Sequence, residues 1–459
     1  MNRAGRPEPL RNSFRTLVLA ALVLAPWALG ATHALAYVPL LAVAYLAGLT
    51  SWARGHWARA HGHPTPLVPG TAILAALLAL PLFQLVPLPP ALLRLVSPGS
   101  FAYYSFVTLG PELGWRPISV SPPDTLRGVV FAGGLVLLYA FAFRELGSHR
   151  WRRYVVVAVV TGATLMTAAA LVQAQSAEPS RILGVYKPPW DWAVFGPYVN
   201  KNHFAGYVAL SVPLALAWTL NAWSALRAEW CRRSLRRWLA IGEKAGHILV
   251  LRVALTLFLL VGIFAAGSRG ALLAVCAGVV VAPLLARRRW PGRLALSLAT
   301  ATVVVLFATG TLSNLASRGM RDIRFAIWPS ALRMVPDFPW LGSGLNTFGT
   351  AFMRYRAFKS NDWVGEAHND FLQSLTDTGV IGAGLVAVFA ARLVLGAARH
   401  AGSGVLGAGL LGSVLVSCAN ACVDFNWQIP ANAATFAVLA GLAMRGGGAA
   451  RDAHPDQPT

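Results

Sequence analysis

Long apolar runs, separated by shorter polar segments, follow one another along most of this chain. A run of about 18 or more apolar residues is long enough to cross a bilayer core of about 30 Å as a helix. The runs are continuous and do not alternate at every second residue, which argues against a membrane barrel. We therefore expect an all-α polytopic membrane protein with about 12 transmembrane helices, at residues 14–31, 34–50, 67–87, 124–143, 154–175, 203–223, 247–266, 270–286, 294–310, 378–397, 403–422 and 430–444.

Composition supports this class. Hydrophobic residues make up 56% of the 459 residues and charged residues only 12%, about half the share of a soluble domain. The net charge of +22 is large enough to suggest nucleic-acid binding, so its placement decides its meaning. With both termini cytoplasmic, the basic clusters at 232–237 and 287–289 lie on inner segments, whereas the acidic residues are mostly on outer ones. This is the positive-inside pattern, so the charge indicates topology and not a nucleic-acid surface.

The first apolar run has two interpretations. Arg11 and Arg15, followed by an apolar stretch and the small residues of 28–36, resemble a secretory signal peptide. A second apolar run follows within a few residues, which favours an uncleaved first span. Cleavage would leave the orientation of the remaining helices unchanged.

The polar segments differ in length on the two sides. Inner connections are mostly short and basic, whereas the outer segments 88–123 and 176–202 are long. We expect helices one to nine within residues 1–310, an outer catalytic loop at 311–377, helices ten to twelve within 378–444, and a disordered cytoplasmic tail at 445–459. Function is therefore expected on the outer face.

Several common motifs are missing. There is no Walker A sequence, no HExxH, and no Asp-x-Asp pair of the kind that holds a metal for nucleotide-sugar transfer. Two GxGxxG matches within 402–412 lie in an apolar run without a preceding strand, so close helix crossings explain them better than a dinucleotide site. Cys418 and Cys422 share a helix face but have no nearby His, which favours packing over metal binding.

Three polar residues stand at the outer ends of apolar runs. Arg269, between glycines and with almost no loop on either side, is either a snorkelling side chain or a functional cation. Arg324, before an aromatic run, is either a solvated loop residue or a ligand-binding one. His368, just before a span, is either a hydrogen-bonded structural residue or a proton acceptor near neutral pH.

Together these residues suit one kind of chemistry. Arginine holds a diphosphate through bidentate, charge-assisted hydrogen bonds. Histidine can take the proton of a sugar hydroxyl that attacks the carbon bearing the diphosphate. The negative charge that develops on the leaving group would be met by the two cations, so this step needs no metal.

Further outer residues are candidates for substrate contacts. Asn202 and His203 could instead cap or pack a helix, Lys201 could anchor at the level of the lipid headgroups, and Asp424 could bond to the loop backbone. For the outer tryptophans, stacking on sugars competes with a place in the interfacial aromatic belt. The candidates are Lys201, Asn202, His203, Asn369 and Asp424, and the tryptophans are Trp190, Trp192, Trp328, Trp340 and Trp363.

Most of the chain resembles the O-antigen ligase and polymerase family of bacterial membrane glycosyltransferases. The resemblance depends on the order and membrane placement of several motifs together. These are FQLVPLPP (83–90), YVNKNHFAGY (198–207), GSRG (267–270), the stretch 324–349, AHNDFLQSLTDTGVIG (367–382) and VDFNWQIPANA (423–433).

The resemblance implies a GT-C-like bundle in the bacterial inner membrane, with a partly helical periplasmic loop over the site. It implies a polyprenyl-diphosphate-linked glycan donor and transfer without nucleotide, cofactor or metal. The acceptor would be a lipid A core or a growing lipopolysaccharide or exopolysaccharide chain, and polysaccharide-assembly proteins are possible partners. Arg269 and Arg324 match the family's diphosphate-binding arginines, and His368 matches the proposed catalytic base. Asp377 stands where relatives commonly have Glu.

Two other classes of function compete with glycan transfer. A lipid-linked-glycan flippase or exporter would carry polar residues near the bilayer midplane, often in repeated halves, and neither feature is visible here. A non-catalytic subunit of an envelope polysaccharide machine would use the outer loop for docking. For the enzyme, we expect a cysteine at Ser343 to be labelled from the periplasm alone.

Overall fold

The structure is a computed structural model that describes residues 8–63, 65–108, 113–189, 193–230, 235–286, 322–360, 363–402 and 404–446. Within these ranges the regular structure is helical, and the only β-type pairings are isolated bridges such as Leu88–Arg116. The helices are α1 (Glu8–Leu24), η1 (Ala25–Trp27), η2 (Leu29–Ala31), α2 (Ala34–Ala60), α3 (Thr71–Gln84), α4 (Pro90–Val96), α5 (Pro98–Val107), α6 (Pro122–Glu145), α7 (His149–Ala174), α8 (Lys201–Trp230), α9 (Leu235–Ala265), α10 (Arg269–Leu285), α13 (Arg324–Leu332), α14 (Phe348–Phe352), α15 (Asp370–Ala401), α16 (Val405–Ala421), η4 (Asn426–Gln428) and α17 (Pro430–Arg445).

The expected all-α membrane protein is confirmed. Six helices in the described residues are long and apolar enough to cross a membrane: α2, α6, α7, α8, α9 and α15. Shorter apolar helices are α3, α10 and α16. The count of about 12 spans stays a prediction, and the span expected at 294–310 and nearly all of the expected tail lie outside the described residues.

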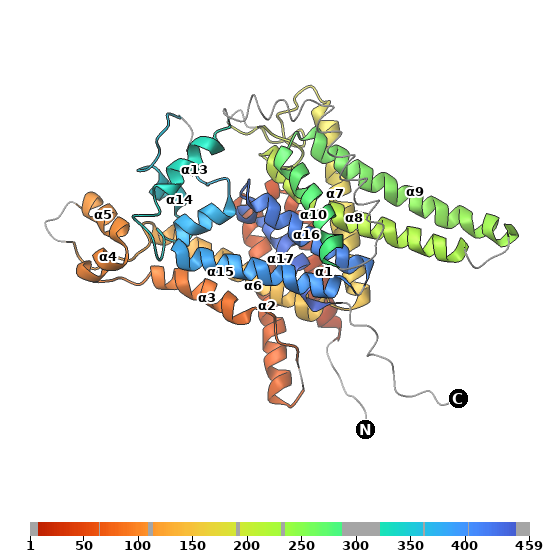
Figure 1. Ribbon diagram of the computed structural model, residues 1–459, viewed down its shortest axis with the longest axis horizontal. Coiled ribbons are helices and arrows are strands. Elements are labelled where there is room, and N and C mark those ends of the chain that lie inside the picture. The colour runs from red at the N-terminus through yellow and green to blue at the C-terminus, as the bar shows by residue number, and fades with distance from the viewer. Residues whose placement is uncertain are drawn as a thin grey trace.

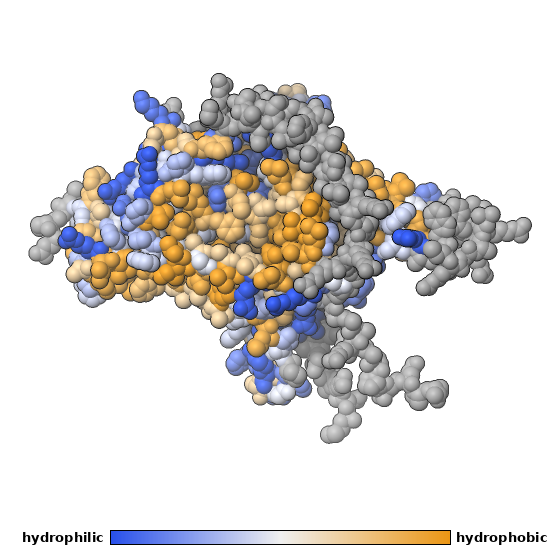
Figure 2. All heavy atoms as spheres, in the orientation of Figure 1, coloured by the Kyte–Doolittle hydropathy of each residue, from blue (hydrophilic) through white to orange (hydrophobic). Residues whose placement is uncertain are grey.

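The helices form one bundle around α16 and α17. α16 packs against α8, α10 and α15, whereas α17 packs against α6 and α15. In Figure 1, α8 and α9 run side by side, α13 and α14 lie at the upper edge of the bundle, and the far end of α2 projects from the opposite edge. On the face that Figure 2 shows, apolar residues cover the middle, and hydrophilic ones gather around α13 and on the projecting end of α2. This apolar band is the surface expected to face lipid.

Glycines of the GxGxxG matches lie at a close helix crossing. A Cβ on Gly409 would lie 2.6 Å from that of Ala217, and one on Gly412 would lie 2.7 Å from that of Pro213. Both contacts are on α8, so α16 can approach α8 only where side chains are missing. The interpretation of this pattern as helix packing is confirmed.

α15 begins earlier than expected and is broken. The sequence places the start of this span at 378, but the helix starts at Asp370 because Asn369 Oδ1 accepts the N–H groups of Phe371 (3.1 Å) and Leu372 (3.0 Å). At Gly379 the backbone leaves the helical region, with φ 65° and ψ −172°. The segment 370–378 is therefore an outer piece of helix joined to the long piece by one glycine.

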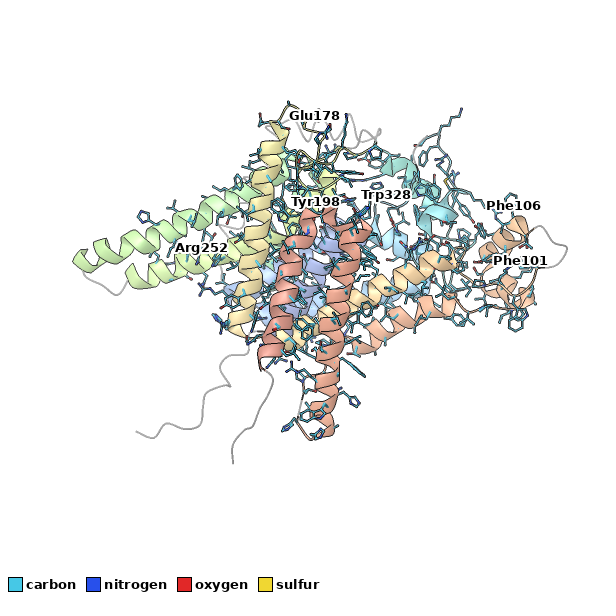
Figure 3. All side chains as sticks on the ribbon, turned by 180° about the vertical axis from the view of Figure 1, so that it is seen from behind. Phe101, Phe106, Glu178, Tyr198, Arg252 and Trp328 are labelled. Atoms are coloured by element: carbon cyan, nitrogen blue, oxygen red, sulfur yellow. The ribbon has the colours of Figure 1, made fainter. Side chains whose placement is uncertain are left out.

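Residues 322–360 and 363–369, the loop lobe, have their own apolar core. Ile327, Phe338, Phe348 and Phe352 are buried in it together with Val120 from the segment before α6. Figure 3 shows Trp328 of the loop lobe on the same side of the molecule as Tyr198 and Glu178. The lobe is thus a packed body of short helices at one edge of the bundle.

Candidate active site

Cations stand at the first residue of three helices: Lys201 in α8, Arg269 in α10 and Arg324 in α13. The N-terminus of a helix carries unpaired N–H groups and a partial positive charge, so a cation there is not favoured by its own helix. The helix N-terminus and the cationic side chain both attract an anion, and phosphate groups commonly bind at helix N-termini. These positions are therefore suited to holding a phosphorylated ligand.

Arg269 and Arg324 both lie close to the carboxylate of Asp322. Asp322 lies between them, with Oδ2 3.9 Å from Arg269 NH2 and Oδ1 3.9 Å from Arg324 Nε. Asp322 Oδ1 also accepts the backbone N–H of Arg324 at 3.1 Å. Arg269 and Arg324 remain partly exposed, with 32% and 19% of their side chains accessible. A carboxylate thus lies between two guanidinium groups that a ligand can still reach.

Asp424 is the centre of the buried part of the site. Its Oδ1 lies 3.6 Å from His368 Nδ1 and 3.9 Å from His203 Nε2, and its Oδ2 lies 3.9 Å from Arg324 NH2. Only 4% of the Asp424 side chain is exposed. Burial raises the pKa of this carboxyl, but His368, His203 and Arg324 together lower it by more, so the net shift is downward. Asp424 is therefore held as a carboxylate facing His368.

His368 has an unusual backbone, with φ 52°. A side chain other than glycine is uncommon in this region and costs roughly 1–3 kcal/mol, so neighbouring bonds must hold it there. Ala367 supplies them: its N–H donates to Gln373 Oε1 at 2.9 Å, and its carbonyl accepts from Trp328 Nε1 at 3.0 Å. The second bond also ties α13, which begins with Arg324, to the residue beside His368.

One aromatic ring contacts both histidines. Phe425 meets His203 and His368 edge to face, with ring centroids 4.4 and 4.7 Å apart. His203 is buried, and its carbonyl accepts from Asn432 Nδ2 at 2.9 Å. A Cβ on Gly206 would lie 2.2 Å from Asn426 Oδ1, so only glycine lets α8 approach this turn. These contacts hold both imidazoles against Asp424.

The remaining predicted residues lie around this centre. Lys201 Nζ is near the turn before Arg269, 3.6 Å from where a Cβ on Gly267 would stand. Asn202 is half-buried and its N–H donates to Asn200 Oδ1 at 2.8 Å, so Asn200 caps α8. Asn369 uses its side-chain oxygen to cap α15. Of these three residues, Lys201 is the one whose side chain reaches the turn before Arg269.

The outer tryptophans are dispersed. Trp340 and Trp363 are exposed, and Trp190 and Trp192 lie outside the described residues. Trp328 instead forms the bond to Ala367. The roles of Asp322 and Trp328 were missed from the sequence, although both stand within four residues of Arg324.

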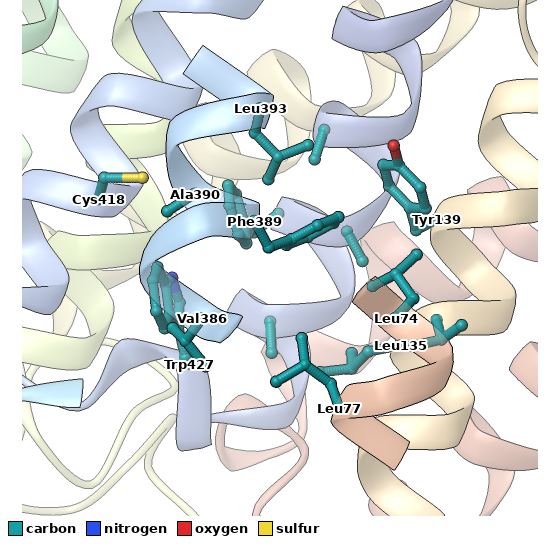
Figure 4. A pocket seen from close by; sticks show the side chains of 15 residues that line it. Leu74, Leu77, Leu135, Tyr139, Val386, Phe389, Ala390, Leu393, Cys418 and Trp427 are labelled. Atoms are coloured by element: carbon teal, nitrogen blue, oxygen red, sulfur yellow. The ribbon is translucent and has the colours of Figure 1, made fainter. Parts of the chain in front are cut away.

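An apolar cavity of about 200 Å³ lies next to the site (Figure 4). Its lining includes Leu74 of α3, Tyr139 of α6, Phe389 of α15 and Trp427 of the turn after Asp424. The N–H of Trp427 donates to Asp370 Oδ2 at 3.1 Å. No charged residue lines this cavity. It therefore adjoins the site but supplies no group that could react.

Because Glu366 is a buried carboxyl, we expect the stability of the folded protein to depend on pH. Burial raises the pKa of this carboxyl from 4.5 to about 7, against a lowering hydrogen bond from Gln373. Between these values the folded chain binds more protons than the unfolded chain, so stability falls as pH rises. Glu366→Gln keeps an acceptor for Gln373 and removes the ionisation. We expect its melting temperature to exceed that of the unchanged protein by more at pH 8 than at pH 5, measured by thermal unfolding in detergent. A pH-independent difference would contradict this assignment.

The fold and site define a multi-pass helical membrane protein in which arginine, histidine and carboxylate side chains converge at helix ends. Residues 254–387 match the family model described as O-antigen ligase, which confirms the family indicated by the motifs. This range holds Arg269, Arg324 and His368, and ends before Asp424. The match supports a role in glycan transfer during lipopolysaccharide or polysaccharide assembly. No curated protein sequence matches the chain significantly.

Proposed function

We propose that this protein transfers a glycan from a polyprenyl-diphosphate carrier to a sugar hydroxyl, as an O-antigen ligase or as a polymerase of O-antigen or exopolysaccharide. The observation that carries the proposal is the contact series from Arg269 through Asp322 and Arg324 to Asp424 and His368. It joins cations suited to a diphosphate with a histidine suited to a proton transfer. The apolar cavity beside Trp427 offers a surface for the polyprenyl chain.

In the proposed step, Arg269 and Arg324 bind the diphosphate of the donor. His368 takes the proton of the acceptor hydroxyl on Nε2 while Asp424, facing Nδ1, stabilises the resulting imidazolium. The acceptor oxygen bonds to the anomeric carbon, and the bond from that carbon to the diphosphate oxygen breaks. The polyprenyl diphosphate leaves with its added charge on the two arginines, so no metal is required. A single displacement inverts the anomeric configuration.

A reconstituted assay tests the function. Purified protein in liposomes is given a lipid-linked donor and candidate acceptors, and products are separated by size. A ligase forms one lipid A-core conjugate, and a polymerase forms a ladder of lengths. The proposal is contradicted if no donor is consumed, or if NMR shows that the product retains the donor's anomeric configuration.

The proposed location is the bacterial inner membrane, with both termini cytoplasmic and residues 311–377 as a periplasmic catalytic loop. Cysteine labelling at Ser343 cannot test this as expected from the sequence, because that side chain is 0% exposed and bonded to Thr347. Lys359, in the loop lobe after α14, and His61, directly after α2, are both exposed, and α14 and the far end of α2 lie at opposite edges of the bundle in Figure 1. We expect Lys359→Cys to react with a membrane-impermeant maleimide in intact spheroplasts and His61→Cys only after lysis; the reverse result inverts the topology.

A further inference from the structure

Gln84, the last residue of α3, is a fully buried amide with 0% exposure. Its Nε2 donates to the carbonyls of Leu341 and Asp377, the second at 2.8 Å. Its Oε1 accepts the N–H of Leu345 at 2.9 Å. One side chain of the bundle is therefore bonded both to the loop lobe and to α15.

These bonds fall on the break in α15. Because the chain turns at Gly379, the N–H groups of Val380 and Ile381 bond to the carbonyls of Pro339 (2.9 Å) and Trp340 (3.3 Å) and not to their own helix. Loop N–H groups also donate to carbonyls at the end of the outer piece of α15. The N–H of Ser343 donates to the carbonyl of Thr376 (2.9 Å), and that of Gly344 donates to the carbonyl of Asp377 (3.0 Å). The loop lobe thus replaces the missing turn of the helix.

The fit between loop and helix excludes side chains. Gly342 and Gly379 both have positive φ, of 72° and 65°. A Cβ on Gly342 would lie 2.2 Å from the carbonyl carbon of Asp377, and one on Gly379 would lie 2.3 Å from that of Trp340. The Asp377 carboxylate adds a bond from the N–H of Asn346 at 2.9 Å. We call residues 339–346, residues 376–381 and Gln84 the clasp.

The clasp sets the position of the outer piece of α15. Residues 370–378 begin two positions after His368 and continue into the rest of α15 through Gly379. Arg269 and Asp424 belong to the bundle, on α10 and on the turn after α16. Rotation at Gly379 would move His368 relative to both, and Gln84 bonds the two segments that meet at this point.

We propose that Gln84 is a positioning residue for the transfer reaction, which locks the angle at Gly379 and so holds His368 against Asp424. The inference depends on the proposed function, since it assigns no reacting atom to Gln84. A hydrocarbon side chain at this position would leave the N–H of Leu345 without the partner it has now.

A matched control exists in Gln173, near the end of α7. It too is buried, donates Nε2 to a carbonyl (Pro179, 3.1 Å) and accepts a backbone N–H (Leu183, 3.0 Å). The loop that it holds belongs to the segment between α7 and α8. Gln84→Leu and Gln173→Leu therefore remove the same kinds of bond at two different loops, three bonds at Gln84 and two at Gln173.

In the reconstituted assay we expect Gln84→Leu to lower kcat about 10- to 100-fold while KM for the donor changes less than about threefold, because both arginines remain to bind the diphosphate. Gln173→Leu is expected to stay within about twofold on both constants. The folded fraction of each variant is measured by size exclusion and thermal unfolding. Equal kinetics for the two variants, or a loss that only follows the folded fraction, overturns the proposal.

A second measurement does not need activity. Hydrogen–deuterium exchange of residues 341–346 and 376–381 should be faster in Gln84→Leu and unchanged in Gln173→Leu. Unchanged exchange in Gln84→Leu overturns the clasp even if the protein is active. If the unchanged protein transfers no glycan although Gln84→Leu accelerates exchange, the proposed function fails and the clasp stands.

Discussion

Replacing His368 with Ala is expected to abolish glycan transfer and leave the protein inserted and folded. A positioned general base typically contributes about 10² to 10⁴ in rate, and His368 is the histidine of this site that remains accessible, with 24% of its side chain exposed. The alanine does not relieve the strained backbone, because it too has a Cβ and φ stays positive in the folded loop. The measurement is initial transfer rate per folded protein, with donor and acceptor both saturating.

Two further variants test whether the loss of transfer is specific to the imidazole of His368. His61→Ala removes an exposed histidine at the far end of α2 and should keep full activity. Asp424→Asn keeps the shape of the side chain but not its charge, so it should lower kcat by roughly 10². Retained transfer in His368→Ala removes the base assignment, whatever the other variants do.

Arg269→Lys is expected to cause the second largest loss of activity. Lysine keeps the charge but lacks the planar fork that binds two phosphate oxygens together. A charge-assisted hydrogen bond contributes about 1.5–3 kcal/mol, so we expect kcat/KM for the lipid-linked donor to fall about 10- to 100-fold. The quantity to measure is kcat/KM over a series of donor concentrations in mixed micelles.

Arg181→Lys is the matched control for this change. Arg181 is also paired with a carboxylate, that of Glu178, but its hydrogen bonds go to Glu178 and Val185 in the segment between α7 and α8. Its replacement should leave donor kinetics unchanged. Activity of Arg269→Lys equal to that of Arg181→Lys would show that Arg269 only snorkels to the headgroup level.

Much of the fold follows from local pattern. Apolar runs predict membrane helices because a helix satisfies its own backbone groups, so no distant partner is needed to define it. The same logic places the site residues: Arg269, Arg324 and His368 were found because each polar side chain stands at the end of an apolar run. Asn369 was expected only as a possible substrate contact, although its role as the cap of α15 acts within one turn and is therefore local.

The relations between segments needed the tertiary structure. Asp424 lies 56 residues after His368, and no local rule pairs them; the shared contact arises because α15 and α16 pack side by side. The break at Gly379 was hidden because apolar residues continue past it. Gln84 looked like an isolated amide in an apolar motif, and its partners are more than 250 residues away.

The sequence by itself determined the membrane class, the positions of most helices and the chemical types gathered at their ends, because hydrophobicity, length and capping are local properties. Only the tertiary structure decided which ends meet. It brought the N-termini of α8, α10 and α13 to the start of α15, and placed Asp322 between the arginines and Asp424 beside both histidines. That choice depends on how helices pack across the whole bundle, and a diphosphate site needs several cations from distant segments within a few ångströms of one another.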